Sequence, residues 1–428
     1  MSLSQFRIIE HTVPCESIRE YHHAVKTDSP PLQLAIKQYI PLSNPNPGPD
    51  DITIIAGHAN GIPKECYEPI WDELVALTNV KIKSIWFADC AHQGASGVLN
   101  EQILGDDPNW FDHSRDLLHM VNHFRDEIKT PIVGIAHSFS CAAFVHLSIM
   151  HPRLFHSLIF LEPMIQLESP SKPGGRSPAL WASSRPDFWP SMEAATTYIQ
   201  RNPFWRTWDP RARNKYIQHG LRPTPTALYP NTDSAGVTLT TTKAQEAWTY
   251  LRFNASPRGS ATDPTERLLG PDLATTTNAT ELHNNNPEYV SVCPWCCLAF
   301  EFLPYVRPSV LFIFGEKSHI NIPDRRRDKL ERTGTGLGGS GGAGAGRVKE
   351  AVISGASHLA PLEKVDDTAR VLARWVEEQV GGYKMEKEFF EREYQSGKSE
   401  RDGMELSGLW MEYVKRPVDT KRPGKARL

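Results

Sequence analysis

Short apolar runs alternate with segments of helical periodicity through the first 165 residues of the chain. The helical segments are 65–77 and 111–124, the second with Leu117, Val121 and Phe124 on one face. Alternation of strands and helices is typical of a mainly parallel sheet with helices on both faces, so the sequence predicts the α/β fold class. The apolar runs predict strands at 34–40, 52–56, 81–88, 131–136 and 158–161.

The pattern breaks after Glu168 into a long Pro-rich and aromatic region that extends to about Tyr305. Structureless loops of that length are uncommon in compact domains, so we expect a partly helical insertion that caps the sheet. The α/β pattern then resumes, with strands at 308–314 and 348–353 and a helix at 365–380. The predicted domains are a first core part at 1–167, a cap at 168–306, a second core part at 307–383 and a charged tail at 384–428.

A glycine-rich run at 334–346 follows a charged, helix-like segment and leads into a strand. A nucleotide-binding loop has the reverse order and ends in Gly-Lys-Ser/Thr, which is missing here. We therefore expect a flexible surface loop.

Composition narrows the function classes. Of 428 residues, 39% are apolar and 23% are charged, as in ordinary globular proteins. Forty-seven basic against fifty acidic residues give a net charge of −3, so no overall positive field exists to attract nucleic acid. No apolar run approaches the roughly 18 residues of a membrane span, and the start of the chain lacks the order of a secretory signal. Seven scattered cysteines indicate reduced thiols rather than a disulfide framework.

The last three residues carry a targeting signal. Ala426, Arg427 and Leu428 have the small, basic, leucine pattern of a C-terminal peroxisomal address, at the end of a strongly charged tail. The sequence therefore predicts peroxisomal localisation through the import receptor.

A candidate nucleophile lies where a strand, a sharp turn and a helix follow one another. The run 131–136 leads directly into Ser138 and then into an apolar helical segment. In a nucleophile elbow a strained turn of this kind presents the serine hydroxyl above the sheet, between small residues. Ala136 and Ser140 stand where the usual Gly-x-Ser-x-Gly motif has glycines, and both are small. The alternative is a serine that only caps the helix.

A serine nucleophile needs a base and an acid, which in this arrangement follow in the order Ser, acid, His. His358 stands in a loop of small residues after the last predicted strand, where the base belongs. The acid is Glu162 or Glu316. The acid commonly lies just after the penultimate strand, but Ser318 occupies that position here. Glu316 is too close to the end of the strand to take its place. We therefore favour Glu162, which follows the strand at 158–161. The alternative is that the carboxylate of Glu162 only forms hydrogen bonds with nearby backbone groups.

The oxyanion formed during acyl transfer needs two backbone N–H donors. Phe139, the residue after the serine, supplies the first, and the turn after strand 52–56 supplies the second from Asn60, with Ala59 as the next choice. Asp89, His92, Asp112 and His113 show no metal-ligand spacing, so neither a metal nor a cofactor is predicted. The pair Cys293 and Cys296 resembles a redox motif, but we expect a packing or hinge role because no strand precedes it.

Long strings along the chain resemble one protein family. They include HANGIPKECYEPIWDEL, DPNWFDHSRDLLHMVNHFR, PIVGIAHSFS, LEPMIQL and SGASHLAP, together with the terminal tripeptide. The chain resembles the fungal peroxisomal α/β-hydrolases of secondary metabolism, which include toxin-biosynthesis hydrolases and the mycophenolic acid acyl-CoA hydrolase. The resemblance implies an α/β-hydrolase fold with Ser138 as nucleophile and His358 as base. Its acid is an aspartate, matched here by Glu162, which is one methylene longer.

The resemblance also implies a substrate. It suggests a serine hydrolase for the acyl-CoA thioester of a polyketide or terpenoid-like acid. The residues alone indicate acyl transfer to water, so a hydrolase of a small-molecule ester or lactone is the close alternative. A catalytically decayed relative that binds an acyl intermediate is the second alternative, because Ala136, Ser140, Cys141 and Glu162 depart from the family pattern. The sequence leaves a homodimer open beside a monomer.

Overall fold

The computed structural model describes residues 5–168, 177–232, 236–253, 290–292, 294–394, 397–414 of the chain. The chain divides into two compact units, Met1–Val380 and Gly381–Leu428. Within the described ranges, no helix combines the length and the hydropathy that a membrane crossing requires.

The first unit is built on a mainly parallel sheet, which confirms the predicted α/β class. The first two strands run antiparallel to their neighbours, and every later neighbouring pair is parallel. The central strands are buried on both faces, which is why they appear in the sequence as continuous apolar runs. In spatial order the described strands are β1 (Phe6–Pro14), β2 (Gln33–Pro41), β4 (Ile82–Ala88), β3 (Ile52–Gly57), β5 (Ile132–His137), β6 (Ser157–Leu161), β12 (Ser309–Gly315) and β13 (Val348–Ile353).

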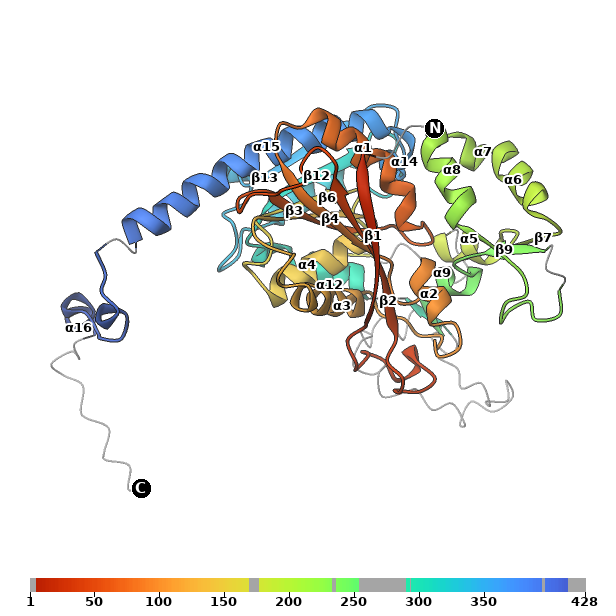
Figure 1. Ribbon diagram of the computed structural model, residues 1–428, viewed down its shortest axis with the longest axis horizontal. Helices are drawn as coiled ribbons and strands as arrows, with labels where there is room; N and C mark the ends of the chain where they lie inside the picture. Colours follow the sequence, from red (N-terminus) through yellow and green to blue (C-terminus); the bar gives the residue numbers. More distant parts are fainter. Residues whose placement is uncertain are drawn as a thin grey trace, which may run out of the picture. The chain divides into compact units, whose positions relative to one another are not determined.

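Helices cover both faces of the sheet (Figure 1). On one face pack α3 (Trp110–His123), α4 (Ser140–Met150) and α12 (Trp295–Phe302). On the other pack α1 (Glu68–Leu77) and the first part of α15 (Val365–Phe389). The remaining helices around the sheet are α2 (Gly94–Leu99), α13 (Pro323–Arg332) and α14 (Ala360–Glu363), with single turns at Lys64–Tyr67, His22–Ala24, Leu303–Tyr305 and Ala343–Ala345.

The register of the parallel strands brings their carboxyl ends together. Gly57 of β3 pairs with Ala136 of β5, and His137 pairs with Leu161 of β6. Leu161 in turn lies beside Ile313, close to the end of β12. The loops that follow these strands therefore meet at one edge of the sheet, where ligands bind in open α/β sheets.

Between β6 and β12 the chain forms a separate group of short elements. They comprise two small antiparallel sheets, one ordered β7-β9-β8 and one formed by β10 and β11, and several helices. The helix α12, although it belongs to the predicted insertion, packs against α4 on the main sheet. The described elements are α5 (Pro178–Ser184), β7 (Phe188–Trp189), α6 (Met192–Arg201), α7 (Pro203–Arg206), α8 (Pro210–His219), β8 (Leu221–Pro223), β9 (Val237–Leu239), α9 (Lys243–Trp248), β10 (Leu251–Phe253) and β11 (Val290–Val292).

The predicted elements differ from the observed ones mainly at the two ends. The strand β1 was not predicted, because this edge strand exposes much of one face and carries polar residues there. The helix α15 continues to Phe389, nine residues beyond the predicted end at Val380. The glycine-rich run lies on the surface, and backbone hydrogen bonds join Gly334 and Gly336 to the turn at Leu303–Tyr305.

The second unit contains the end of α15, a π-turn at Phe390–Tyr394, a 3-10 turn at Arg401–Gly403 and α16 (Gly408–Tyr413). The predicted targeting residues Ala426, Arg427 and Leu428 lie outside the described residues.

Candidate active site

Ser138 occupies a strained turn between β5 and α4. Its φ of 60° lies in the left-handed region that non-glycine residues rarely adopt, and its N–H donates to the carbonyl of Leu161 at 3.0 Å. Strain of this kind persists only where the surrounding structure fixes it, and it clusters at functional sites. The geometry is that of the predicted elbow.

The residues that replace the usual glycines are accommodated around this turn. The hydroxyl of Ser140 donates to the carbonyl of His58 at 2.5 Å, which links the elbow to the loop after β3. The thiol of Cys141 donates to the carbonyl of Ala136 at 3.2 Å. The larger side chains therefore form contacts within the turn, and Ser138 keeps the elbow conformation.

The predicted serine, histidine and acid come together at the edge of the sheet. Oγ of Ser138 lies 2.9 Å from Nε2 of His358, and Nδ1 of that ring lies 3.1 Å from Oε2 of Glu162. These three residues come from loops after β5, β13 and β6, so the strand register described above is what unites them. The arrangement can move a proton from the hydroxyl to the imidazole while the carboxylate orients the ring.

Glu162 is fully buried and held by four hydrogen bonds. Besides His358, its carboxylate accepts from the N–H of Gly315 at 2.6 Å, the hydroxyl of Ser318 at 2.6 Å and the amide of Asn321 at 2.9 Å. Burial acts to raise the pKa of Glu162, but the bond and charge of His358 and the donors Ser318 and Asn321 outweigh it and lower the pKa. The carboxylate is therefore kept ionised beside the ring.

Ser318 is the side chain that stands where the acid commonly falls in this arrangement. Here its hydroxyl donates to Glu162. The acid thus comes from the loop after β6, while the loop after β12 supplies donors that hold it. Sequence reasoning noted the serine but had no signal for this supporting role.

Glu316, the alternative acid, lies elsewhere. Its carboxylate accepts from the N–H of Gly355 at 2.7 Å and the hydroxyl of Ser354 at 3.0 Å, and the side chain is exposed. It forms no bond with His358 among the described residues. The geometry therefore favours Glu162 over Glu316.

The two predicted oxyanion donors are Phe139, which follows Ser138 in the chain, and Asn60, in the loop after β3. Asn60 lines the same cavity as Ser138, and within the described ranges no hydrogen-bond partner is found for the backbone N–H of Asn60 or Phe139. The N–H of Ala59, the second choice, donates to the hydroxyl of Tyr67 at 2.9 Å. The N–H groups of Phe139 and Asn60 therefore stay the candidate oxyanion donors.

A buried relay that the sequence did not reveal connects the loop after β3 to the histidine loop. The hydroxyl of Tyr67 lies 2.6 Å from Nδ1 of His137, and Nε2 of His137 lies 3.0 Å from the carbonyl of His358. Burial, followed by the charge of His358, lowers the pKa of His137 to about 3, so the ring is neutral and can accept from Tyr67 while donating to the carbonyl. The relay fixes the backbone of both loops.

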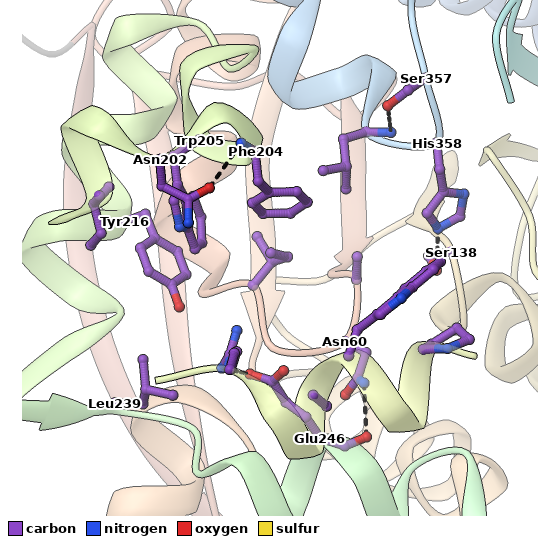
Figure 2. A pocket seen from close by; sticks show the side chains of 18 of the residues that line it. Asn60, Ser138, Asn202, Phe204, Trp205, Tyr216, Leu239, Glu246, Ser357 and His358 are labelled. Carbon is purple, nitrogen blue, oxygen red and sulfur yellow. Dashed lines mark hydrogen bonds and ion pairs between the residues drawn. The ribbon is translucent and has the colours of Figure 1, made fainter. Parts of the chain in front are cut away.

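A cavity of about 560 Å³ opens in front of Ser138 and His358. Figure 2 shows these two residues on one side and Trp205 and Tyr216 on the opposite side. The wall is mostly apolar and aromatic, which suits a large apolar group. Its aromatic residues are Trp181, Trp189, Tyr198, Phe204, Trp205, Tyr216 and Tyr250.

Comparison with known proteins identifies the family. The chain is 35% identical over 436 residues to the type I acyl-CoA thioesterase mpaH of Penicillium roqueforti, covering 97% of this chain and 96% of that protein. It is also 35% identical to mpaH' of Penicillium brevicompactum over the whole of both chains. The chain belongs to this family of fungal acyl-CoA thioesterases. It is an α/β-hydrolase enzyme. No family model matches the chain.

The fold of this thioesterase family member also occurs among solved structures. The peroxisomal α/β-hydrolase Lpx1 of Saccharomyces cerevisiae matches with a TM-score of 0.65 and 18% identity, covering 88% of this chain and 90% of that one. At this identity the likeness shows the fold alone, and it confirms the predicted α/β-hydrolase fold.

Three of the four residues considered as metal ligands have polar partners, whereas neither ring nitrogen of the buried His113 has a hydrogen-bond partner among the described residues. Asp89 pairs with the buried Lys64, and Asp112 pairs with Arg19. Nε2 of His92 lies 3.2 Å from the hydroxyl of Thr249. In the described part of the chain, no group of three or more histidine, cysteine or acidic side chains could hold a metal.

The cysteine pair considered from the sequence is only partly described. Cys293 lies outside the described residues, while Cys296 is buried in α12 with its sulfur 3.8 Å from that of Cys297. The strand β11 (Val290–Val292) ends directly before Cys293, so the expectation that no strand precedes the pair was wrong. The packing or hinge role stays a prediction.

Proposed function

We propose that the chain is a serine hydrolase that cleaves an acyl-CoA thioester of a secondary-metabolite intermediate, with Ser138 as nucleophile, His358 as base and Glu162 as acid. The observation that carries the proposal is the continuous contact from Ser138 through His358 to Glu162, with distances of 2.9 Å and 3.1 Å. The name of the relatives, acyl-CoA thioesterase, supports the thioester as the bond cleaved.

The reaction has two half-reactions. Oγ of Ser138 attacks the thioester carbonyl while Nε2 of His358 takes its proton, and the negative charge formed on the carbonyl oxygen is stabilised by the N–H groups of Phe139 and Asn60. The intermediate collapses with cleavage of the carbon–sulfur bond, and His358 returns the proton to the thiolate of coenzyme A. Water, deprotonated by His358, then attacks the acyl-enzyme, and the acid leaves as Ser138 regains its proton.

The charge of Glu162 stabilises the imidazolium of His358 in both half-reactions. The lowered pKa of Glu162, in which the donors overcome the effect of burial, supports this role because the carboxylate is ionised before the substrate binds. The ring tautomer with a proton on Nδ1 also follows, since a carboxylate can only accept at that position.

The acyl group is proposed to be large and apolar. The cavity in front of Ser138 has a volume of about 560 Å³, and aromatic side chains make up much of its wall. A polyketide or terpenoid-like acyl group fits this description. The contacts around Ser138 support acyl transfer from esters as well, so an ester or lactone hydrolase is the alternative that the assay must separate.

The direct test is release of free coenzyme A from short, long and bulky acyl-CoAs, followed with a chromogenic thiol reagent. We expect turnover by the wild-type chain, none by Ser138→Ala, and unchanged turnover by Ser399→Ala, an exposed serine of the second unit. A fluorophosphonate should label the wild type and Ser399→Ala but not Ser138→Ala.

The outcomes distinguish the alternatives. Cleavage of aryl esters without cleavage of any acyl-CoA would favour an ester or lactone hydrolase. If folded protein cleaves neither and remains unlabelled, the proposal is wrong and the chain is a decayed acyl-binding relative.

We also propose that the enzyme acts in the peroxisome, entering through its terminal Ala426, Arg427 and Leu428. A fluorescent protein placed at the N-terminus of the full chain should give peroxisomal puncta. Deletion of Leu428 alone should make the signal diffuse, whereas a diffuse signal from the intact chain would contradict the proposal.

A further inference from the structure

A charged pair interrupts the apolar wall of the cavity. Arg185 follows α5 and Glu246 lies on α9, and both line the cavity that contains Ser138. Nη2 of Arg185 is hydrogen-bonded to Oε1 of Glu246. Figure 2 shows Glu246 between the side of the cavity that carries Tyr216 and the side that carries Ser138. Placing charged side chains in apolar surroundings has an unfavourable free energy, so we expect this pair to have a function.

The pair leaves hydrogen-bonding capacity unused. A guanidinium has five N–H donors, and Nε of Arg185 is buried without a hydrogen-bond partner among the described residues. About a quarter of the Arg185 side chain stays exposed, at 25%, whereas only 7% of Glu246 does. Because Arg185 lines the cavity, a bound acyl group can reach this exposed part.

The charges of the pair are only partly balanced. Burial raises the pKa of Glu246 to about 7, although the charge and hydrogen bond of Arg185 act in the opposite direction. Near neutral pH the carboxyl is therefore protonated in part of the molecules, while the guanidinium remains charged. An oxygen acceptor on a ligand would complete the solvation of that charge.

The pair is fixed relative to the reacting centre. A Cβ placed on Gly61 would come within 2.3 Å of the Glu246 carboxylate, so this side chain packs directly on the loop after β3. The amide of Asn60 donates to the backbone carbonyl of Glu246 at 3.0 Å. The same loop carries the proposed oxyanion donor, so the distance between the pair and the scissile carbonyl is set by the protein.

We propose that Arg185 and Glu246 form a subsite for an oxygen substituent, a hydroxyl or carbonyl, on an otherwise apolar acyl group. The subsite selects oxygenated acyl groups over plain hydrocarbon ones of the same length. Arg185 interacts with Glu246 and Tyr216, but a hydrocarbon offers no acceptor to the part of its guanidinium that faces the cavity. This inference rests on the proposed acyl-CoA hydrolase function and specifies its substrate class.

The test compares two series of increasing chain length, straight alkanoyl-CoAs and the ω-hydroxyalkanoyl-CoAs of the same lengths. At the length that places the hydroxyl beside Arg185, we expect kcat/KM to favour the hydroxylated substrate by about tenfold to a hundredfold, the usual effect of a hydrogen bond to a charged group. The double variant Arg185→Met with Glu246→Gln should lose this preference and retain cleavage of the alkanoyl series.

The matched control is Arg222→Met. Arg222 forms a comparable ion pair with Glu101, and its Nε is likewise buried without a partner within the described ranges, but it does not line the cavity. The control should keep the hydroxyl preference. Circular dichroism and thermal unfolding check that all variants fold.

The results separate this inference from the function on which it rests. Equal cleavage of both series by the wild type at every length would overturn the subsite while leaving the hydrolase intact. An equal fall for both series in the double variant would show a structural ion pair instead, which also contradicts the subsite. If the wild type cleaves no acyl-CoA, the proposed function fails, and the subsite fails with it.

Discussion

Replacing Glu162 with glutamine separates the charge of the acid from its length. Oε2 accepts from His358, Ser318 and Asn321, and Oε1 accepts from the N–H of Gly315. A glutamine has one oxygen and one NH₂ group. In either orientation its NH₂ therefore faces a donor, and in one of them it meets Nδ1 of His358 and favours the wrong tautomer of the ring.

The expected loss can be estimated from these contacts. An acid-to-amide change in a serine protease triad lowers kcat by about 10⁴, which corresponds to about 5.5 kcal/mol. We expect a loss of about 10³ to 10⁴ in kcat for Glu162→Gln, since the ring has the same dependence on its acid here. Glu162→Asp keeps the charge but withdraws the carboxylate by about 1.5 Å, the length of one carbon–carbon bond. That variant should lose about ten- to a hundredfold, because the donors are placed for the longer side chain.

The assay is steady-state thiol release, with thermal unfolding to confirm that each variant is folded. Glu316→Gln is the matched control, because this glutamate is exposed and bonds Ser354 and Gly355 instead of His358. Its kcat should stay within about twofold of wild type, as expected for a surface substitution. If folded Glu162→Gln keeps a tenth or more of the wild-type kcat, or if Glu316→Gln has the larger effect, the assignment of the acid is wrong.

Three further predictions follow from buried groups. Tyr67→Phe removes the hydrogen bond to His137. We expect kcat to fall while KM changes little, because the relay positions the loops and does not bind the acyl group. A change in KM as large as the change in kcat would contradict this. His92 and His137 are held neutral by burial, with the pKa of each lowered from 6.5 to about 3. Below pH 6.5 each histidine is protonated in the unfolded chain but stays neutral in the folded one until about pH 3. Between these values each should lower the free energy of unfolding by about 1.4 kcal/mol for every pH unit of acidification, measured by urea unfolding. His92→Asn should make this pH dependence less steep. Lys64→Met leaves Asp89 buried without its counter-charge and should lower the free energy of unfolding by about 3–5 kcal/mol in urea titrations, whereas a loss below 1 kcal/mol would show that the pair is dispensable.

Much of the fold could be predicted from local sequence pattern. Four central strands, β3, β5, β6 and β12, are buried on both faces, so each is a mostly apolar run. Ser138 could be predicted in the same way, because it immediately follows such a strand. His358 could be predicted because it lies in a loop of small residues after β13, the last strand of the sheet. The edge strand β1 lacks this signal, since much of one face is exposed to solvent.

The acid could be predicted only as one of two residues. Both Glu162 and Glu316 follow a buried strand, and what separates them is the set of donors around each carboxylate. Those donors come from residues more than 150 positions away from Glu162, as in its bonds to Ser318 and Asn321. No periodicity in a single sequence reports such a pairing.

The aromatic residues between β6 and β12 allowed two interpretations from sequence, an acyl-binding wall or the packed core of an insertion. In the structure, cavity-lining and core aromatic residues lie side by side. Trp205 lines the cavity and also packs on Trp208 at a ring distance of 4.7 Å, while Trp208 itself is buried and does not line the cavity. The indole ring of Trp205 thus lines the cavity with one side and packs in the hydrophobic core with the other. An aromatic wall anchored in this way is held rigid by its own packing. A rigid apolar wall discriminates weakly between acyl groups of similar size, because one methylene more or less is worth only about 1–3 kcal/mol. For the large acyl groups proposed as substrates, we therefore expect selectivity to depend on polar groups in the wall, where Arg185 and Glu246 form an ion pair.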